Sequence, residues 1–306
     1  MIYLFLAILS STGVSLILKY GEKKQFNRYL ITSANYFIAF SISLGLSYPV
    51  LKNSELCRFK LGNFIDLFSN LGCSLPLNYQ QSILWALIVG IFAGILYFLG
   101  FISIQASLNE KGVGITGAFS KLGILVPMIL SLIFWKEFPN YIQSIGILTA
   151  IASIFVINPV LEKKKTLSKV DFTLLSVFIF VGLAEFSNKL FQKYGGDYYK
   201  SIFLFVVFFV AFFISIFFAW KKARSKLQLK AIFLGLMAGI PNLFASYFLI
   251  KSFDYFKTTI AFPIYCTGSI LLMSLAGFFI YREKMKTREI FAVVLIVIGI
   301  IFMNIK

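Results

Sequence analysis

The chain has 306 residues, of which 59% are hydrophobic and only 13% charged, and its mean hydropathy is +0.88. This composition excludes an ordinary soluble domain and indicates a protein that lies in lipid. The net charge of +17 does not indicate nucleic-acid binding, because the basic residues lie between apolar runs and form no continuous surface. With no histidine and three cysteines, the sequence has no metal-ligand spacing and lacks the commonest general base. We therefore expect no metal and no cofactor.

Ten apolar segments follow one another, each near the ~20 residues that a helix needs to cross a bilayer. The first has no basic stretch before it, so it is predicted to be a retained span and not a signal peptide. Most connections are short, which makes consecutive spans antiparallel neighbours. The sequence thus predicts an all-α membrane protein with spans at residues 2–18, 30–50, 83–106, 113–135, 141–159, 172–192, 201–220, 231–250, 258–281 and 289–305.

The 29 Lys and Arg residues predict the orientation of these spans. Eighteen lie on the face that the first span reaches at its carboxyl end, nine lie on the opposite face, and Lys121 and Lys189 lie inside spans. Because cytoplasmic loops are enriched in Lys and Arg, the first face is predicted to be cytoplasmic. Both chain termini are then outside.

The longest connection, residues 51–82, is predicted to lie on the outer side. Its segment FKLGNFIDLFSNLG places apolar side chains on one helical stripe, which indicates a short amphipathic helix lying in the membrane interface. Cys57 and Cys73 flank this segment. They form a disulfide if the outer space is oxidising, or they are two unrelated free thiols. Cys266 lies inside a span and is interpreted as a packing residue.

Several motifs recur in order along the chain, which favours an internal duplication over chance similarity between apolar helices. Because each copy would hold five spans, the second copy would enter the membrane from the opposite face. The sequence therefore predicts two inverted repeats, residues 1–159 and 160–306. The matched pairs are GIFAGI at 90–95 with GLMAGI at 235–240, FWKEF at 134–138 with IYREK at 280–284, IFVIN at 154–158 with IIFMN at 300–304 and, more weakly, KYG at 19–21 with KYG at 193–195.

Two five-helix halves, each ending in an aromatic-(Lys/Arg)-Glu corner and a Gly-bearing span, resemble the EamA-like family of the drug/metabolite transporter superfamily. The corner glutamates are Glu137 and Glu283, which we interpret as structural. The resemblance covers nearly the whole chain, although the long loop at 51–82 departs from the family pattern. It implies a ten-helix basket around a central cavity. It implies no single substrate, because the superfamily carries amino acids, sugars, nucleotide-sugars, cations and lipid-linked groups.

Lys121 is the sharpest candidate for a functional residue, because it lies well inside the fourth span. An ammonium group at that depth costs about 2.5–3.5 kcal/mol on insertion scales, so it needs a polar cavity, a partner or a ligand. The functional interpretation is that Lys121 binds an anion or a carboxylate of the substrate. The alternative is a lysine whose side chain extends along a helix groove to the interface.

Glu185 and Lys189 lie four residues apart in the sixth span, so they share one helix face and can pair. One interpretation is a structural ion pair near the outer end of the helix. The other is that Glu185 is a protonatable group that couples transport to protons, with Lys189 beside it.

Other polar residues and prolines at span depth complete the candidate site. A proline frees a backbone carbonyl and weakens its helix, which transporters use at binding sites and hinges, although a harmless kink is the alternative. Each polar side chain can also bond simply to a neighbouring backbone. The candidates for substrate binding, besides Lys121, are Tyr97, Ser120, Asn242 and Tyr265, and the candidate hinges, which we expect to interrupt their spans, are Pro127, Pro241 and Pro263.

These features favour a secondary active transporter, an exporter or exchanger that moves a small polar metabolite such as an amino acid by alternating access. No Walker motif is present, so a gradient of protons or another ion, or exchange, would drive it. The first alternative is a carrier or flippase for a nucleotide- or lipid-linked group. The second is a non-transporting membrane scaffold, which leaves Lys121 unexplained. The predicted partners are a small-molecule substrate, an ion and the lipid bilayer, and the predicted location is a bacterial or archaeal cell membrane.

Overall fold

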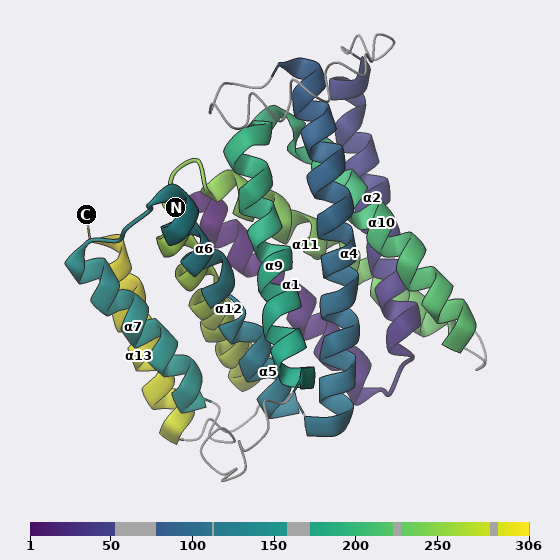
Figure 1. Cartoon of the computed structure of the whole chain (residues 1–306). Coiled ribbons are helices and arrows are strands. Elements are labelled where there is room, and N and C mark those ends of the chain that lie inside the picture. Colours follow the sequence, from purple (N-terminus) through teal and green to yellow (C-terminus); the bar gives the residue numbers. More distant parts are fainter. Residues whose placement is uncertain (53–77, 112, 158–171, 223–227, 282–286, 306) are drawn as a thin grey trace. The chain divides into compact units, whose positions relative to one another are not determined.

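The computed structural model describes residues 1–52, 78–111, 113–157, 172–222, 228–281 and 287–305. Within these residues the regular elements are helices, and no strand occurs (Figure 1). The predicted all-α class is therefore confirmed. The helices are α1 (Ile2–Lys23), α2 (Arg28–Lys52), α4 (Tyr79–Lys111), α5 (Val113–Leu122), α6 (Leu125–Trp135), α7 (Tyr141–Ile157), α9 (Phe172–Gly195), the 3₁₀ turn η2 (Asp197–Tyr199), α10 (Lys200–Lys222), α11 (Leu229–Ser252), α12 (Thr258–Tyr281) and α13 (Thr287–Asn304).

These helices correspond one by one to the ten predicted spans, with α5 and α6 together forming the fourth. Among the described residues, α1, α2, α4, α9, α10 and α11 are long and apolar enough to cross a membrane, and four shorter apolar stretches supply the remaining spans. The predicted interfacial helix, Cys57, Cys73 and the corner at Glu283 lie outside the described residues.

The fourth span differs from the single helix that the sequence predicted. The chain leaves the α-helical conformation at Gly123 and Ile124, between α5 and α6. A continuous run of apolar residues sets the length of a span but does not determine whether its backbone hydrogen bonds continue.

The chain divides into two compact units. Unit 1 comprises residues 1–12, 99–186 and 252–306, and unit 2 comprises residues 13–98 and 187–251. Each unit takes segments from both predicted repeats, and the helices α1, α4 and α9 each contribute to both units.

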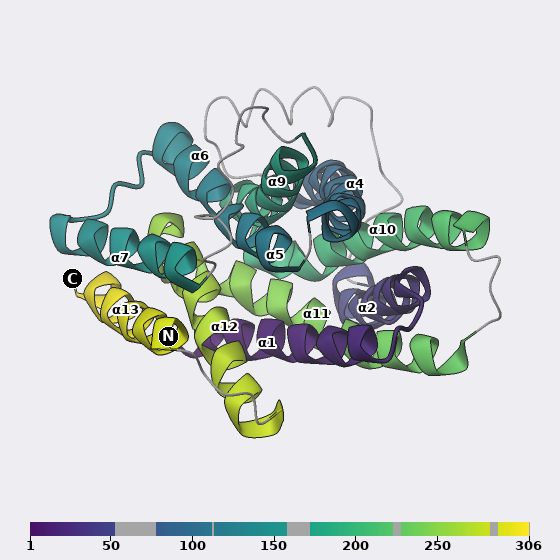
Figure 2. The ribbon, with the colours of Figure 1, turned by 90° about the horizontal axis from the view of Figure 1, so that it is seen from below.

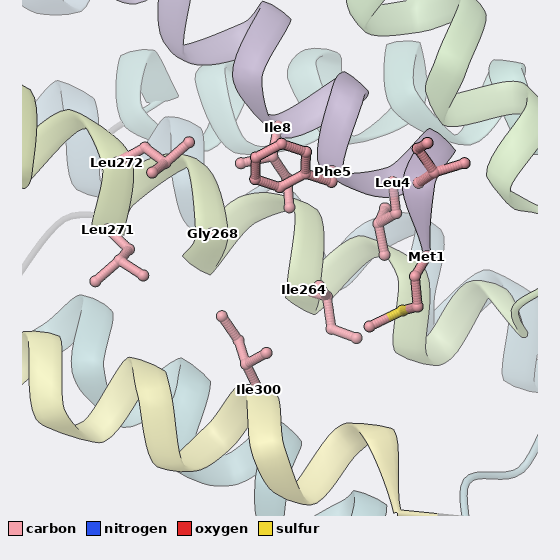
Figure 3. Close-up of a pocket in the computed structure, with 10 residues that line it drawn as sticks. Met1, Leu4, Phe5, Ile8, Ile264, Gly268, Leu271, Leu272 and Ile300 are labelled. Carbon is pink, nitrogen blue, oxygen red and sulfur yellow. The ribbon is translucent and has the colours of Figure 1, made fainter.

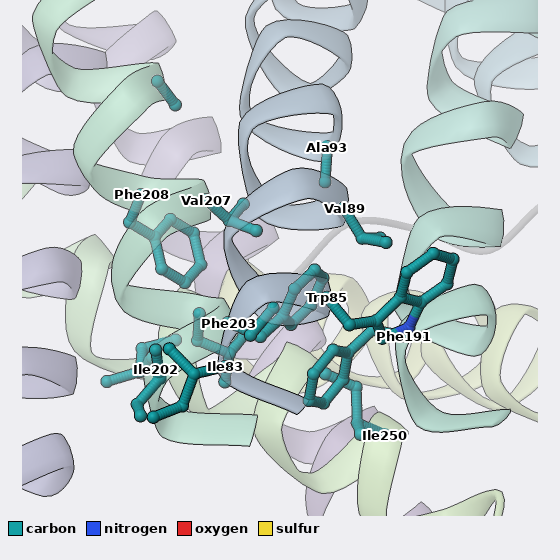
Figure 4. Packing of buried hydrophobic residues seen from close by; sticks show 14 of the residues in the cluster. Ile83, Trp85, Val89, Ala93, Phe191, Ile202, Phe203, Val207, Phe208 and Ile250 are labelled. Carbon is teal, nitrogen blue, oxygen red and sulfur yellow. The ribbon is translucent and has the colours of Figure 1, made fainter. Parts of the chain in front are cut away.

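The core of unit 2 is a cluster of buried apolar side chains, many of them aromatic (Figure 4). The rings of Phe191 and Phe203 stack within it, with centroids 4.3 Å apart. Helix α4 approaches α10 closely because Gly90 and Gly94 face it, and a Cβ atom at Gly94 would lie 2.7 Å from the carbonyl oxygen of Val207. Such small residues let helices pack tightly in lipid.

The second copy of this glycine motif packs in the same way. Gly235 and Gly239 of α11 lie against α2, where an added Cβ atom would collide with the carbonyl oxygens of Ile31 and Asn35. The residues that these two motifs contact, 31–38 and 203–210, are related by an offset of 172 residues. The repeat predicted from the sequence is thus present as repeated packing.

Helices α2 and α10 carry a further repeat that the sequence analysis missed, YFIAFSIS at 36–43 and FFVAFFIS at 208–215. Equivalent residues meet each other: the ring centroids are 6.1 Å apart for Tyr36 and Phe208, and 5.2 Å apart for Phe40 and Phe212. The offset is 172 residues here but 145 at the glycine motifs, because the long connection after α2 adds 27 residues to the first half. A search at one constant offset does not find both.

Helices α2 and α10 run in opposite directions, as an inverted repeat requires. At one end, the Tyr79 hydroxyl donates to the Val50 carbonyl at 3.3 Å, and the Tyr79 ring lies 5.5 Å from the Tyr199 ring. The end of α2 therefore lies beside the start of α10. At the other end, the Asn27 amide donates to the Gln228 side chain at 2.9 Å, so the start of α2 lies beside the link that follows α10.

In unit 1, α7 and α13 lie side by side (Figures 1 and 2). Gly146 and Gly299 bring them together, since a Cβ atom at Gly146 would lie 2.8 Å from the Gly299 carbonyl oxygen. The Glu137 carboxylate accepts a 2.6 Å hydrogen bond from the Thr258 amide and so caps the start of α12. Lys257 Nζ donates to the Phe138 carbonyl at 2.9 Å. These bonds support a structural role for the Glu137 corner.

Candidate functional site

Lys121 lies in the last turn of α5, directly before the break in the fourth span. In the break, the Ile124 amide donates to the Lys121 carbonyl at 3.3 Å and the Val126 amide to the Gly123 carbonyl at 3.0 Å, which tightens the turn. Pro127 has no N–H group to donate to Gly123 in the usual α-helical pattern. Discontinuous spans with unwound backbone form substrate and ion sites in secondary transporters. The predicted site lysine thus lies at such a break.

Helix α9 packs on this break through a glycine. A Cβ atom at Gly182 would lie 2.5 Å from the Gly123 carbonyl oxygen and 2.6 Å from Val126 Cβ, so no larger residue fits. Glu185 follows on the next turn of α9 and is half-buried. The close crossing at Gly182 therefore brings an acidic side chain toward the segment that carries Lys121.

Cys266 on α12 lies beside both of these charges. Its thiol donates a weak hydrogen bond to the Lys121 carbonyl at 3.7 Å and lies within electrostatic range of both Lys121 and Glu185. Tyr265 and Ser120, the residues that precede Cys266 and Lys121, are half-buried. Unit 1 therefore brings together the segments that hold four of the predicted site residues: Ser120, Lys121, Glu185 and Tyr265.

The Lys121 ammonium makes no hydrogen bond and no ion pair with any other residue that the structure describes. Its side chain is half-buried. A lysine inside a span that no side chain neutralises is suited to an anionic ligand.

The crossing at Lys121 has an equivalent in the other half of the chain. There Gly268 of α12 packs against Ile8 of α1, and a Cβ atom at Gly268 would lie 2.7 Å from Ile8 Cδ1. Gly268 follows Gly123 by 145 residues and Gly182 follows Ile8 by 174, which are the offsets of the repeated GIFAGI and KYG motifs. At the same offsets, the equivalents of Lys121 and Glu185 are the uncharged Cys266 and Ser11. Only one of the two crossings is therefore charged.

Unit 2 holds a separate polar network around Tyr97. The Asn188 side chain donates to the Tyr97 hydroxyl at 3.1 Å, and that hydroxyl lies 3.3 Å from the Ser246 hydroxyl. Asn188 is fully buried and Ser246 is 6% exposed. This network links α4, α9 and α11, so it holds Tyr97 in a fixed orientation.

Asn242 makes a different contact, because its side-chain amide donates to the Asn35 side-chain oxygen at 2.9 Å. Sequence reasoning selected Tyr97 and Asn242 but not their partners Asn188, Ser246 and Asn35. The spacing of Asn242 and Ser246, four residues apart on one helix face, would have indicated Ser246. No comparable pattern marks the other two, since their contacts join distant segments.

Lys189 is buried in α9 and donates to the Gln192 side chain at 3.2 Å. Glu185 belongs to unit 1 and Lys189 to unit 2. Their predicted pairing stays a prediction.

The prolines do not interrupt the eighth and ninth spans as expected, because α11 continues through Pro241 and α12 through Pro263. A proline removes one backbone hydrogen bond, and packing against neighbouring helices holds the rest of the span. The Thr267 hydroxyl also donates to the Pro263 carbonyl at 2.6 Å. In the fourth span the break precedes Pro127. The hinge roles of all three prolines remain predictions.

At one end of unit 2, Asp197 accepts hydrogen bonds from Lys200 at 2.7 Å and from Lys251 at 2.5 Å. Lys200 is only 6% exposed, and its ammonium lies 4.2 Å from the centroid of the Tyr247 ring. These contacts tie the end of α11 to the start of α10.

Unit 1 also contains an apolar pocket of about 450 Å³ between α1, α12 and α13 (Figure 3). Only apolar residues line it, so it offers no hydrogen bond to a polar substrate. Its lining includes Leu4, Phe5, Ile8, Ile264, Leu272 and Ile300.

Among the described residues, no group of three His, Cys, Asp or Glu side chains is arranged to hold a metal ion.

Comparisons with known proteins match these observations. A family model described as the EamA-like transporter family matches residues 168–305. An uncharacterized protein of Haemophilus influenzae is 24% identical over 285 residues, which cover 92% of this chain and 90% of that protein. A solved crystal structure with 14% sequence identity covers 99% of this chain and 96% of its own, with a TM-score of 0.71. At that identity the likeness concerns the fold alone, and it extends over the whole chain.

Proposed function

Residues 168–305 belong to the EamA-like transporter family, and on this basis we propose that the chain is a secondary active transporter for a small polar metabolite such as an amino acid. Family membership makes it a multi-pass membrane transporter and not an enzyme; the substrate class and the driving force belong to the proposal. One observation carries it: the fourth span is broken directly after Lys121, whose ammonium no other described residue binds. This arrangement suits a substrate carboxylate.

In the proposed mechanism, Lys121 binds the carboxylate group of the substrate when the site is open to one side of the membrane. Glu185, which lies near the same thiol as Lys121, competes with the substrate for the ammonium while it is ionised. Protonation of Glu185 ends this competition, so proton uptake and substrate binding are coupled. Release on the other side accompanies loss of the proton. The cycle yields exchange or export, according to the gradients present.

The test is transport by the purified protein in liposomes, with a panel of labelled amino acids and other small metabolites. We expect uptake of at least one carboxylate-bearing solute, and we expect Lys121→Met to abolish it while the protein still elutes as a folded species. Lys136→Met, which alters an exposed lysine at the end of the same span, is the matched control and should transport normally. Transport at the parental rate by Lys121→Met would contradict the proposal.

A second candidate, a carrier for a lipid-linked group, is favoured by the apolar pocket alone (Figure 3). Its carbon-only lining suits a hydrocarbon tail. A flipping assay with fluorescently labelled phospholipid in the same liposomes separates the two candidates, because an amino-acid transporter leaves the label on its original leaflet.

A further inference from the structure

The contact between Asn35 and Asn242 joins two carboxamide groups inside membrane-spanning helices. Asn242 Nδ2 donates to Asn35 Oδ1 at 2.9 Å. The glycines at 235 and 239 bring α11 against the backbone of α2 at this level, so the two side chains meet across a very close helix crossing. The fold thus positions this pair firmly.

Most of the hydrogen-bonding capacity of the pair is unused. A carboxamide offers two N–H donors and an oxygen that accepts two bonds. Within the described part of the chain, neither side chain makes a hydrogen bond other than the one that joins them. Two N–H groups of Asn35, one N–H group of Asn242 and the Asn242 oxygen are therefore available. Polar groups inside a span are costly unless they are bonded, so this capacity indicates a ligand.

Tyr97 provides the contrast, because it stands at the position equivalent to Asn242 in the repeat. The two residues are 145 apart, the offset of their neighbouring glycine motifs. The Tyr97 hydroxyl is occupied by Asn188 and Ser246, at 3.1 and 3.3 Å. Asn35 is in turn equivalent to the apolar Val207 at the offset of 172. One copy of this crossing is thus internally bonded, and only the other presents spare donors and acceptors.

We propose that Asn35 and Asn242 form a second substrate-binding element, which binds a neutral group that both donates and accepts hydrogen bonds, such as a carboxamide. The pair supplies N–H donors for the oxygen of such a group and an acceptor for its N–H. The proposal rests on the proposed transport function and deepens it: Lys121 binds the carboxylate of the substrate, and the asparagine pair binds a distal amide.

Glutamine and glutamate are the probes that test this assignment, since they share the same carboxylate and ammonium groups and have nearly the same shape. Binding of each to the purified full-length protein is measured by ligand-induced thermal stabilisation. We expect wild-type protein to bind glutamine more tightly than glutamate. Asn35→Leu and, as a second variant with a smaller change, Asn242→Ala should each weaken glutamine binding about fivefold to tenfold, with glutamate binding unchanged.

Two further variants make the outcome specific. Ser43→Ala removes a buried hydroxyl of α2 that donates to its own helix at Phe40, so both probes should bind it as they bind wild-type protein. Lys121→Met should weaken both probes alike, because it removes the partner of their shared carboxylate. Equal binding of the two probes to wild-type protein, absence of binding, or a glutamine preference that survives both asparagine changes would overturn the proposal. Normal transport by Lys121→Met would instead overturn the proposed function.

Discussion

At the scale of single residues, Glu185 is where proton coupling is open to test. Glu185→Gln keeps the shape of the side chain but cannot lose or gain a proton. We expect this variant to bind substrate while losing any stimulation of transport by a pH gradient. Uptake into liposomes with and without an imposed gradient measures this, and Asp254→Asn, at an exposed residue between α11 and α12, is the control. An unchanged response to the gradient in Glu185→Gln would leave Glu185 as a structural charge.

Asp197 allows a prediction about stability. Its carboxylate is hydrogen-bonded by Lys200 and Lys251, and Lys200 is almost fully buried. Asp197→Asn therefore leaves a buried ammonium without its counter-charge and should lower the free energy of unfolding by roughly 1–3 kcal/mol. The Asp197 side chain is 34% exposed, so the lower part of this range is expected.

The matched comparison for Asp197→Asn is the double variant Asp197→Asn/Lys200→Met. It removes the uncompensated charge as well, so it should recover part of the lost stability. Thermal unfolding of the proteins in the same detergent measures both effects. A double variant that is less stable than Asp197→Asn would show that Lys200 is stabilised by other contacts, such as the Tyr247 ring.

At the scale of elements, hydropathy was sufficient to predict the helices, since every described helix lies within a few residues of a predicted span. The break at Gly123 was not predicted, because a glycine in an apolar run signals only weakly and the contact that requires it comes from α9. The candidate site was predicted in part. Lys121 and Glu185 were evident from their cost in lipid, whereas Asn35 and Asn188 become meaningful only through partners that are 207 and 91 residues away in sequence.

The crossing of α9 over the broken span gives the prediction for this scale. In Gly182→Ala, the new Cβ atom would lie 2.5 Å from the Gly123 carbonyl oxygen, so the two helices must move apart. We expect a loss of about 1–3 kcal/mol in stability, together with loss of transport. Gly45→Ala is the control, because a Cβ atom at Gly45 meets nothing within 4 Å, and removing a helical glycine should be neutral or slightly stabilising. Comparable thermal unfolding of the two variants would contradict the close crossing.

At the scale of the whole molecule, the repeat explains why the charges are confined to one place. The packing relations in each unit occur twice, at offsets that differ only where the chain has gained or lost residues in links. A duplication alone would give two identical crossings. Here one crossing carries Lys121 and Glu185, and its equivalent carries Cys266 and Ser11. A substrate would therefore bind in one orientation, with its carboxylate toward the charged copy.

The last prediction concerns the orientation of the chain in the membrane. In unit 1, the rings of Tyr3 and Tyr255 stack with centroids 5.8 Å apart, so the amino terminus lies on the same side as the link between α11 and α12. The Ile305 carbonyl accepts a 3.1 Å bond from Gln143, which brings the carboxyl terminus to the start of α7. The start of α7 follows the Glu137 corner, which caps α12 from that same link. Both termini therefore lie on one side, the side with fewer basic residues.

By the positive-inside rule this side faces outward. A reporter fused before Met1 and a reporter fused after Lys306 should both indicate the outer face, and a membrane-impermeant maleimide should label Asn53→Cys in intact cells. Labelling of a cysteine placed at Lys226 should require permeabilised cells. Termini on opposite sides would mean that one of the ten segments does not cross the membrane. Both termini inside, with Lys226→Cys labelled from outside, would reverse the orientation and with it the side from which Lys121 first meets its substrate.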